Sequence, residues 1–335
     1  MSTKAGGQAN GKYLAITGGV GGAKLCVGLA HLLGPESLAF LVNTGDDFEH
    51  LGLHVSPDID TLTYALSDLG NPDTGWGRRG ESWNFIETVR QLGGEGWFNL
   101  GDRDLALHVL RTQRLRGGTN LTEVTDGLKS SVGIAHGIFP MCDSPVRTVV
   151  HTLHGSLAFQ HYFVREGCAP TVTGFSFEGA AAAVLNPAAS AWLDDPCLAG
   201  VIICPSNPYV SIDPVLAVPG LRARLRTLRA PVVAISPIVA GLAIKGPTAK
   251  MMQELDVPQT AVAVAMHYLD ILDGFILDAQ DASLVDALAT SDLAAIATPS
   301  VMVTLADKIA LARTTLDFIH QLNMHPTQHA PIPVN

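Results

Sequence analysis

The first polar feature of the chain is a glycine-rich loop, TGGVGGAK, at residues 17–24. It follows a short apolar run and leads into a segment with apolar residues at helical spacing. Glycines let backbone N–H groups approach an anion closely, and the first turn of a helix adds unpaired N–H groups and a positive dipole end. The loop is typical of a phosphate cradle, and a tight strand-to-helix turn is the alternative. Because four glycines exceed what a turn requires, we predict nucleotide contacts from Gly18, Gly19, Val20, Gly21, Gly22 and Lys24.

This loop departs from two common nucleotide-binding motifs. In the Walker A pattern, Ala23 would stand at the second glycine, and Leu25 would stand where Ser or Thr holds magnesium. In the dinucleotide pattern G-x-G-x-x-G, Lys24 would stand at the last glycine. The loop therefore indicates phosphate binding without naming the nucleotide.

An acidic segment follows the next apolar run. Its four aspartates lie within fifteen residues, at Asp46, Asp47, Asp58 and Asp60. Protein sites hold Mg²⁺ through one or two carboxylates together with substrate phosphates, so this density beside a phosphate cradle favours a metal or substrate site. Taken singly, Asp58 also fits a helix N-cap and Asp46 a turn residue. Asp46 would equally suit a ribose hydroxyl in a dinucleotide-binding protein.

Two further polar clusters allow two interpretations each. Asp102, Arg103 and Asp104 begin a helical segment, where Arg103 could bind phosphate or form a surface ion pair. Ser144 lies in the turn Asp143-Ser144-Pro145, close to Arg147, which fits a binding loop or a plain turn. No G-x-S-x-G pattern supports Ser144 as a hydrolase nucleophile.

The elements that must position these residues alternate between strand and helix. The apolar runs at 12–17, 38–42, 200–204 and 231–235 predict buried parallel strands, and those at 274–277 and 301–303 are weaker candidates. We expect helices at 21–33, 58–68, 82–92, 104–115, 121–131 and 305–321. Residues 147–163 predict an antiparallel hairpin around His154-Gly155, which 171–177 could extend.

This order predicts one α/β domain at residues 12–322, with a doubly wound, mainly parallel sheet. We expect a helical insertion at about 58–131 and a hairpin insertion at about 147–178. Residues 1–11 are expected to be a flexible N-terminus and residues 323–335 a loose tail. Ligands bind at the carboxyl ends of parallel strands, where the loops at 17–24, 43–47, 205–208 and 236–237 would form one rim.

Composition limits the classes of function. Of 335 residues 47% are hydrophobic and 16% charged, which excludes intrinsic disorder. The net charge of −10 and the lack of a Lys/Arg block argue against nucleic-acid binding. Five cysteines without a C-x-x-C pair indicate reduced thiols. No apolar run approaches 20 residues, and the N-terminus lacks a signal sequence, so we expect a cytoplasmic protein without a membrane span.

Several motifs together resemble the 2-phospho-L-lactate transferase family of coenzyme F420 biosynthesis, in its bacterial branch. They occur in order between about residues 12 and 278, as GGVGGAKL, NTGDD…GLHVSPDIDT, LGDRDLALHVLR, GGTNLTEVT, PMCDSPVRT, PSNPYVSIDPVLAVPG and SPIVAGLAIKGPTAKMM. The resemblance implies a Rossmann-like fold, a Mg²⁺ requirement and a homodimer. It also implies transfer of phospholactate, phosphoenolpyruvate or phosphoglycerate from a guanosine-diphosphate-linked donor to the ribityl hydroxyl of the deazaflavin Fo, with release of GMP.

The resemblance also suggests roles for individual residues. Asp58, Asp60 and Arg103 would be catalytic, and Asp46 and Asp60 would hold the metal. Contacts with Fo or the donor would come from the glycine loop and from Asn43, Thr44, Gly45, Asp102, Ser144, Ser206, Asn207, Pro208 and Ser236.

Two other functions remain open on sequence alone. One is a regulatory protein of the gluconeogenesis-factor type that binds nucleotide-sugars and shares the glycine loop. The other is an NAD-dependent dehydrogenase, which only the strand–helix–strand opening supports.

Overall fold

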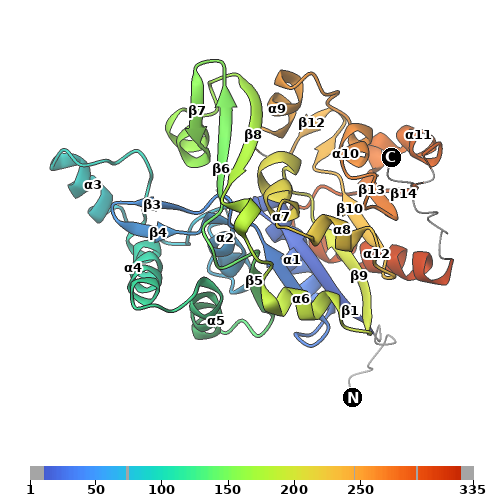
Figure 1. Cartoon of the computed structure of the whole chain (residues 1–335), viewed down its shortest axis with the longest axis horizontal. Coiled ribbons are helices and arrows are strands. Elements are labelled where there is room, and N and C mark those ends of the chain that lie inside the picture. Colours follow the sequence, from blue (N-terminus) through green and yellow to red (C-terminus); the bar gives the residue numbers. More distant parts are fainter. Residues whose placement is uncertain (1–10, 73–74, 245, 292, 326–335) are drawn as a thin grey trace.

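A computed structural model of the chain describes residues 11–72, 75–244, 246–291 and 293–325 (Figure 1). The predicted flexible N-terminus lies outside this range except for Gly11, and the predicted tail lies outside it except for residues 323–325. The last helix, α12 (Leu305–Met324), continues two residues into that predicted tail. Among the described residues, no helix combines the length and apolar character needed to cross a bilayer.

A seven-stranded parallel sheet forms the centre of the molecule, in the order β14-β13-β10-β9-β1-β2-β5 (Figure 1). Its strands are β1 (Lys12–Thr17), β2 (Leu38–Val42), β5 (Gly137–Pro140), β9 (Leu198–Ile203), β10 (Val232–Ile235), β13 (Gly274–Asp278) and β14 (Ala294–Thr298). This order confirms the predicted doubly wound, Rossmann-like α/β fold.

One strand prediction was wrong. The edge strand is β14 at 294–298, whereas residues 301–303 have no regular structure. The strand AAIAT is dominated by alanine, whose low strand preference hides it, while the more strand-like VMV follows a proline.

Alternating side chains of the central strands build two cores, one on each face of the sheet. Leu14, Ile16 and Leu41 belong to one core, and Tyr13 and Phe40 belong to the other. Because successive side chains of a strand point to opposite faces, buried strands covered on both sides read as continuous apolar runs. That is why β1 and β2 were visible in the sequence.

Helices cover both faces of the sheet. Residues of α1 (Gly19–Leu32), α2 (Pro57–Leu66) and α12 contribute to one core. The other core includes residues of α6 (Pro187–Leu193), η3 (Pro208–Ile212), α7 (Asp213–Leu216), α8 (Leu221–Leu225), α9 (Thr248–Glu254), α10 (Ala261–His267) and α11 (Val285–Ala289). Short 3₁₀ turns η2 (Ala180–Ala182) and η4 (Ala279–Leu284) and the small hairpin β11 (Ile238–Val239)–β12 (Leu242–Ala243) complete this part.

Two insertions extend from the sheet. The first contains the hairpin β3 (Phe48–His50)–β4 (Leu53–Val55), then α2, α3 (Asn84–Gln91), α4 (Asp102–Arg116) and α5 (Leu121–Ser131). The second is a three-stranded antiparallel sheet in the order β7-β6-β8, with β6 (Arg147–Thr152), β7 (Gly155–Ala158) and β8 (Val172–Glu178). The predicted hairpin and its extension are thus present. The second strand ends early, because HYFVR forms one π-helical turn, η1 (His161–Arg165).

Candidate functional site

The loops after β1 and β9 meet at the switch point of the sheet. Strand β1 lies between β2, which follows it in sequence, and β9, which comes much later in the chain. At such a point the loops at the strand ends diverge and leave a crevice for a ligand. Here the Ser206 hydroxyl joins the two loops, since it donates to Gly18 O at 2.7 Å and lies 3.3 Å from Gly18 N.

Close packing explains the number of glycines in the loop. A Cβ on Gly21 would lie 2.4 Å from the carbonyl oxygen of Pro205, and one on Gly22 would lie 2.1 Å from the Thr17 hydroxyl. Gly19 has a φ of +63°, a conformation that favours glycine. Helix α1 begins at Gly19, whose N–H donates to the Asp58 side chain, and the positive end of the helix dipole lies at this loop.

The crevice contains a cavity of about 550 Å³. One part of its wall is polar and joins the glycine loop to Asp46, Asp58, Ser206 and Asn207. Another part is aromatic and apolar, with Trp76, Phe98, Phe159, Phe163 and Val164. The cavity therefore offers an anion-binding surface next to a surface suited to a flat ring.

Asp58 fixes the glycine loop from the N-terminus of α2. Its Oδ1 accepts from Gly19 N at 2.7 Å, and its Oδ2 accepts from Asn43 Nδ2 at 2.9 Å. Asn43 also donates to Val210 O and accepts from Gly45 N. Burial raises the pKa of Asp58 to about 6, against the hydrogen bonds from Asn43 and Gly19. Asp58 thus positions the loop with both of its oxygens already engaged.

Asp46 has a different environment. It is 6% exposed and lines the cavity, and among the described residues no donor reaches its Oδ1. Burial, together with the nearby charge of Asp58, raises the pKa of Asp46 well above its usual range. A buried carboxylate oxygen without a partner is costly, and a cation or a proton at Oδ1 would relieve that cost.

The carboxylate of Asp58 gives a pH dependence of stability in the metal-free protein. The pKa of Asp58 in the folded protein lies above the ordinary 3.8. Its contribution to the free energy of unfolding is therefore fully present below about pH 4 and is lost as the pH rises through about 6. The neutral variant Asp58→Asn has no carboxyl group to ionise at this position, so its stability should not fall with pH for this reason. In chelator, we expect its unfolding free energy to gain roughly 3 kcal/mol relative to wild type between pH 4 and 7. Urea unfolding across this range measures the difference, and a constant difference would contradict the raised pKa.

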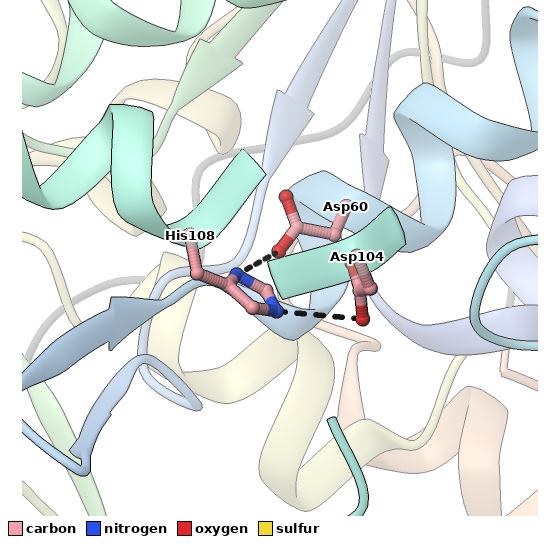
Figure 2. Close-up of side chains that lie close together, drawn as sticks. All are labelled: Asp60, Asp104 and His108. Atoms are coloured by element: carbon pink, nitrogen blue, oxygen red, sulfur yellow. Dashed lines mark ion pairs between the residues drawn. The ribbon is translucent and has the colours of Figure 1, made fainter. Parts of the chain in front are cut away.

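Asp60 lies two residues further on the same helix but belongs to a buried ionic network. Arg111 of α4 binds both of its carboxylate oxygens. Figure 2 shows the His108 ring between two carboxylates, with Nδ1 3.6 Å from Asp60 and Nε2 3.4 Å from Asp104. Tyr64 completes the network through a hydrogen bond to Asp104.

These three residues of Figure 2 offer ligand atoms close enough to share a metal ion. The ring, however, presents a different nitrogen to each carboxylate, and the Arg111 guanidinium already neutralises Asp60. The network ties α2 to α4 and thereby holds the helix that carries Asp58. Asp60 is not among the residues that line the cavity.

A profile of 2-phospho-L-lactate transferase CofD matches residues 14–307. The chain belongs to the CofD family. A 2-phospho-L-lactate transferase of Methanosarcina acetivorans is 38% identical over 269 residues, which cover 80% of this chain and 86% of that protein. A phosphoenolpyruvate transferase of Kitasatospora aureofaciens is 37% identical over 319 residues, which cover 93% and 98%.

A solved structure shares the fold of this CofD-family chain. It is a member of the UPF0052 family from Bacillus halodurans, with a TM-score of 0.60 at 12% identity, covering 92% of this chain and all of that one. At this identity the likeness concerns the arrangement of strands and helices alone.

The CofD-family cavity brings together part of the predicted site. Its lining contains nine of the predicted residues: Gly18, Gly19, Val20, Gly21, Lys24, Asp46, Asp58, Ser206 and Asn207. Three others support it from outside. Gly22 packs against Thr17, Asn43 binds Asp58, and Gly45 packs against Thr148 and lines a neighbouring cavity.

The remaining predicted residues lie elsewhere. Asp102 accepts hydrogen bonds at the start of α3, and the Arg103 guanidinium is near Arg79 O. Ser144 is exposed, and the Ser236 hydroxyl is engaged with the backbone of Ile238. Thr44 and Pro208 are buried behind the lining. The proposed contacts of these six with substrate stay predictions, and Arg103 would have to approach the cavity to act there.

Sequence reasoning missed the aromatic part of the lining. Trp76 and Phe98 come from the first insertion, and Phe159 and Phe163 come from the segment FQHYFV. That segment was interpreted as a strand. The available signal was its two phenylalanines four residues apart, a spacing that places both on one face of a helical turn.

Proposed function

We propose that this protein transfers a phospho-acid from a guanosine-diphosphate-linked donor to the ribityl hydroxyl of Fo in coenzyme F420 biosynthesis, with release of GMP. Family membership supports the reaction class. The observation that carries the proposal is one cavity in which a glycine loop, an unpaired buried carboxylate and an aromatic wall lie together.

The glycine loop is the proposed site of the donor diphosphate. The N-terminus of α1 presents backbone N–H groups and a positive dipole end there. Lys24, on the second turn of α1, lines the same cavity, and its ammonium donates to Met302 O at 2.8 Å while adding a positive charge. Ser206 and Asn207, across the switch point, would contact the guanosine or its phosphate.

Asp46 would hold Mg²⁺ at this site. Asp46 lines the cavity together with the glycine loop, and its buried Oδ1 has no hydrogen-bond partner among the described residues, which suits a cation shared between one carboxylate and substrate phosphates. When bound, such an ion neutralises charge that develops on the diphosphate. The nearby Asp58 has both oxygens engaged by Gly19 and Asn43 and would add negative charge without direct ligation.

The aromatic part of the cavity is the proposed site of Fo. Trp76, Phe98, Phe159 and Phe163 line it, and flat aromatic rings pack favourably against one another. With the ring system held there, the flexible ribityl chain can extend toward Asp46. The terminal hydroxyl oxygen forms a bond to the phosphorus that carries the acid, the bond from that phosphorus to the GMP oxygen breaks, and the hydroxyl proton passes to water. Catalysis then consists mainly of positioning and charge neutralisation.

Titration of Fo tests the acceptor assignment, because Fo fluorescence reports its environment directly. We expect Fo to bind with saturation, and Phe98→Ala to weaken it roughly tenfold or more, as one stacked ring is worth about 1 kcal/mol beyond its buried area. Phe175→Ala is the control, since Phe175 stacks on Tyr209 outside this lining. Absence of saturable Fo binding to wild type would overturn the assignment and would favour a nucleotide-sugar-binding protein or a dehydrogenase. Homodimer formation and a cytoplasmic location stay predictions.

A further inference from the structure

A second cavity lies behind Asp46. Its volume is about 350 Å³, and it is lined by the loop after β2 and by the three-stranded sheet of the second insertion. Asp46, Phe159 and Gln160 belong to the linings of both cavities. The two cavities therefore adjoin at Asp46, the residue where we place Mg²⁺.

Among the described residues that line this second cavity, Arg147 is the one cation. It is half-buried at the start of β6, and one guanidinium nitrogen donates to Val146 O at 2.8 Å. Within the described part of the chain its guanidinium makes no ion pair, although Glu178 lies opposite on β8 and lines the same cavity. An arginine carries five N–H donors, so most of its fork is available to a ligand.

The other acidic groups of this cavity are Asp47 and Glu178, of which Glu178 is exposed and Asp47 is engaged through one oxygen. Asp47 Oδ2 accepts from Ser56 and contacts His54. The backbone is fixed as well, because Thr148 N donates to Gly45 O at 2.7 Å and places Arg147 beside the acidic loop. The remaining N–H donors of the Arg147 guanidinium are suited to binding a planar carboxylate through two parallel hydrogen bonds.

We propose that the second cavity receives the acid part of the donor and that Arg147 binds its carboxylate, an inference that rests on the proposed function. Three groups meet at the reacting phosphorus: the GMP and the acid of the donor, and the incoming ribityl hydroxyl of Fo. The glycine loop takes the GMP and the aromatic wall takes Fo, both in the larger cavity. The acid then has the space beyond Asp46, where a bidentate pair with Arg147 would neutralise the charge of the incoming carboxylate.

Calorimetric titration in the absence of Fo tests this inference. The ligands are GDP, which lacks the acid, and the complete GDP-linked phosphoenolpyruvate donor, both with Mg²⁺. We expect wild type to bind the complete donor more tightly than GDP by about 10- to 100-fold, the range of a charged hydrogen-bonded pair. Arg147→Met should lose this preference while the Kd values for GDP and Fo remain unchanged. Arg147→Lys should retain part of it, because it keeps the charge without the fork.

The control variant is Arg226→Met, which removes an exposed arginine that pairs with Asp270 away from both cavities. It should bind both ligands as wild type does. A full donor preference in Arg147→Met, or in Arg147→Lys if the first variant does not fold, would overturn the inference and leave the proposed function standing. Failure of wild type to bind GDP or to release GMP with Fo would overturn both.

Discussion

Asp46→Asn is expected to lower the rate of transfer by roughly 10²–10⁴-fold, the range found when a metal ligand or an acid–base group is removed. The carboxylate is buried at the cavity wall with an open Oδ1. Asparagine keeps the shape but removes the charge that would hold Mg²⁺. Because the wild-type carboxylate is destabilising in the empty site, the variant should also unfold at a higher temperature at neutral pH.

The measurement is a kinetic assay of GMP release combined with thermal unfolding of the metal-free protein. Asp126→Asn serves as the control, because Asp126 is an exposed carboxylate on α5 that pairs with Lys129. It should leave both quantities near those of wild type. Turnover of Asp46→Asn within a few-fold of wild type would remove Asp46 from the site.

Arg111→Met is expected to destabilise the protein by about 3–5 kcal/mol, because it leaves buried charges without a partner. Arg111 and Asp60 are nearly inaccessible and bind each other across α2 and α4. Burial already raises the pKa of Asp60, and the guanidinium is the main opposing influence. The loss should weaken donor binding too, since α2 carries Asp58 to the glycine loop.

The double variant Asp60→Leu/Arg111→Met is the matched control, because it removes both charges together. We expect it to recover most of the lost free energy of unfolding in urea, since apolar replacement of a whole buried pair is often neutral. If Arg111→Met alone lies within about 1 kcal/mol of wild type, the network is not what holds α2 in place.

Much of the sheet could be predicted because its strands are buried on both faces. Such strands appear as unbroken apolar runs, and the glycine turns after them mark their carboxyl ends. The edge strand β14 was not predicted, because its alanines have a low preference for strands.

The separate roles of Asp58 and Asp60 could not be predicted. Residues two apart on a helix lie about 200° apart around its axis, so the two carboxylates must face different partners. One faces the glycine loop and the other faces Arg111. The sequence shows both acids but not which side of α2 faces the switch point, since that depends on the packing of α2 against α1 and α4.

The aromatic lining, and the position of Arg147 in the second cavity, could not be predicted for a related reason. Their positions depend on contacts between the two insertions and the central loops, which are distant in sequence. Local spacing indicated a strand through FQHYFV, whereas tertiary packing forms a π-helical turn there. Propensity is a weak guide wherever packing overrides it.

Phosphorus NMR of a complete reaction tests the proposed function most directly. Wild-type protein would be mixed with Fo, Mg²⁺ and the GDP-linked phospholactate, phosphoenolpyruvate or phosphoglycerate donor in parallel samples. For at least one donor, the diphosphate signals should be replaced by equal amounts of GMP and of a phosphodiester joined to Fo, and chelator should stop the change. Intact diphosphate in all three samples, or GMP release without an Fo phosphodiester, would contradict the transferase reaction.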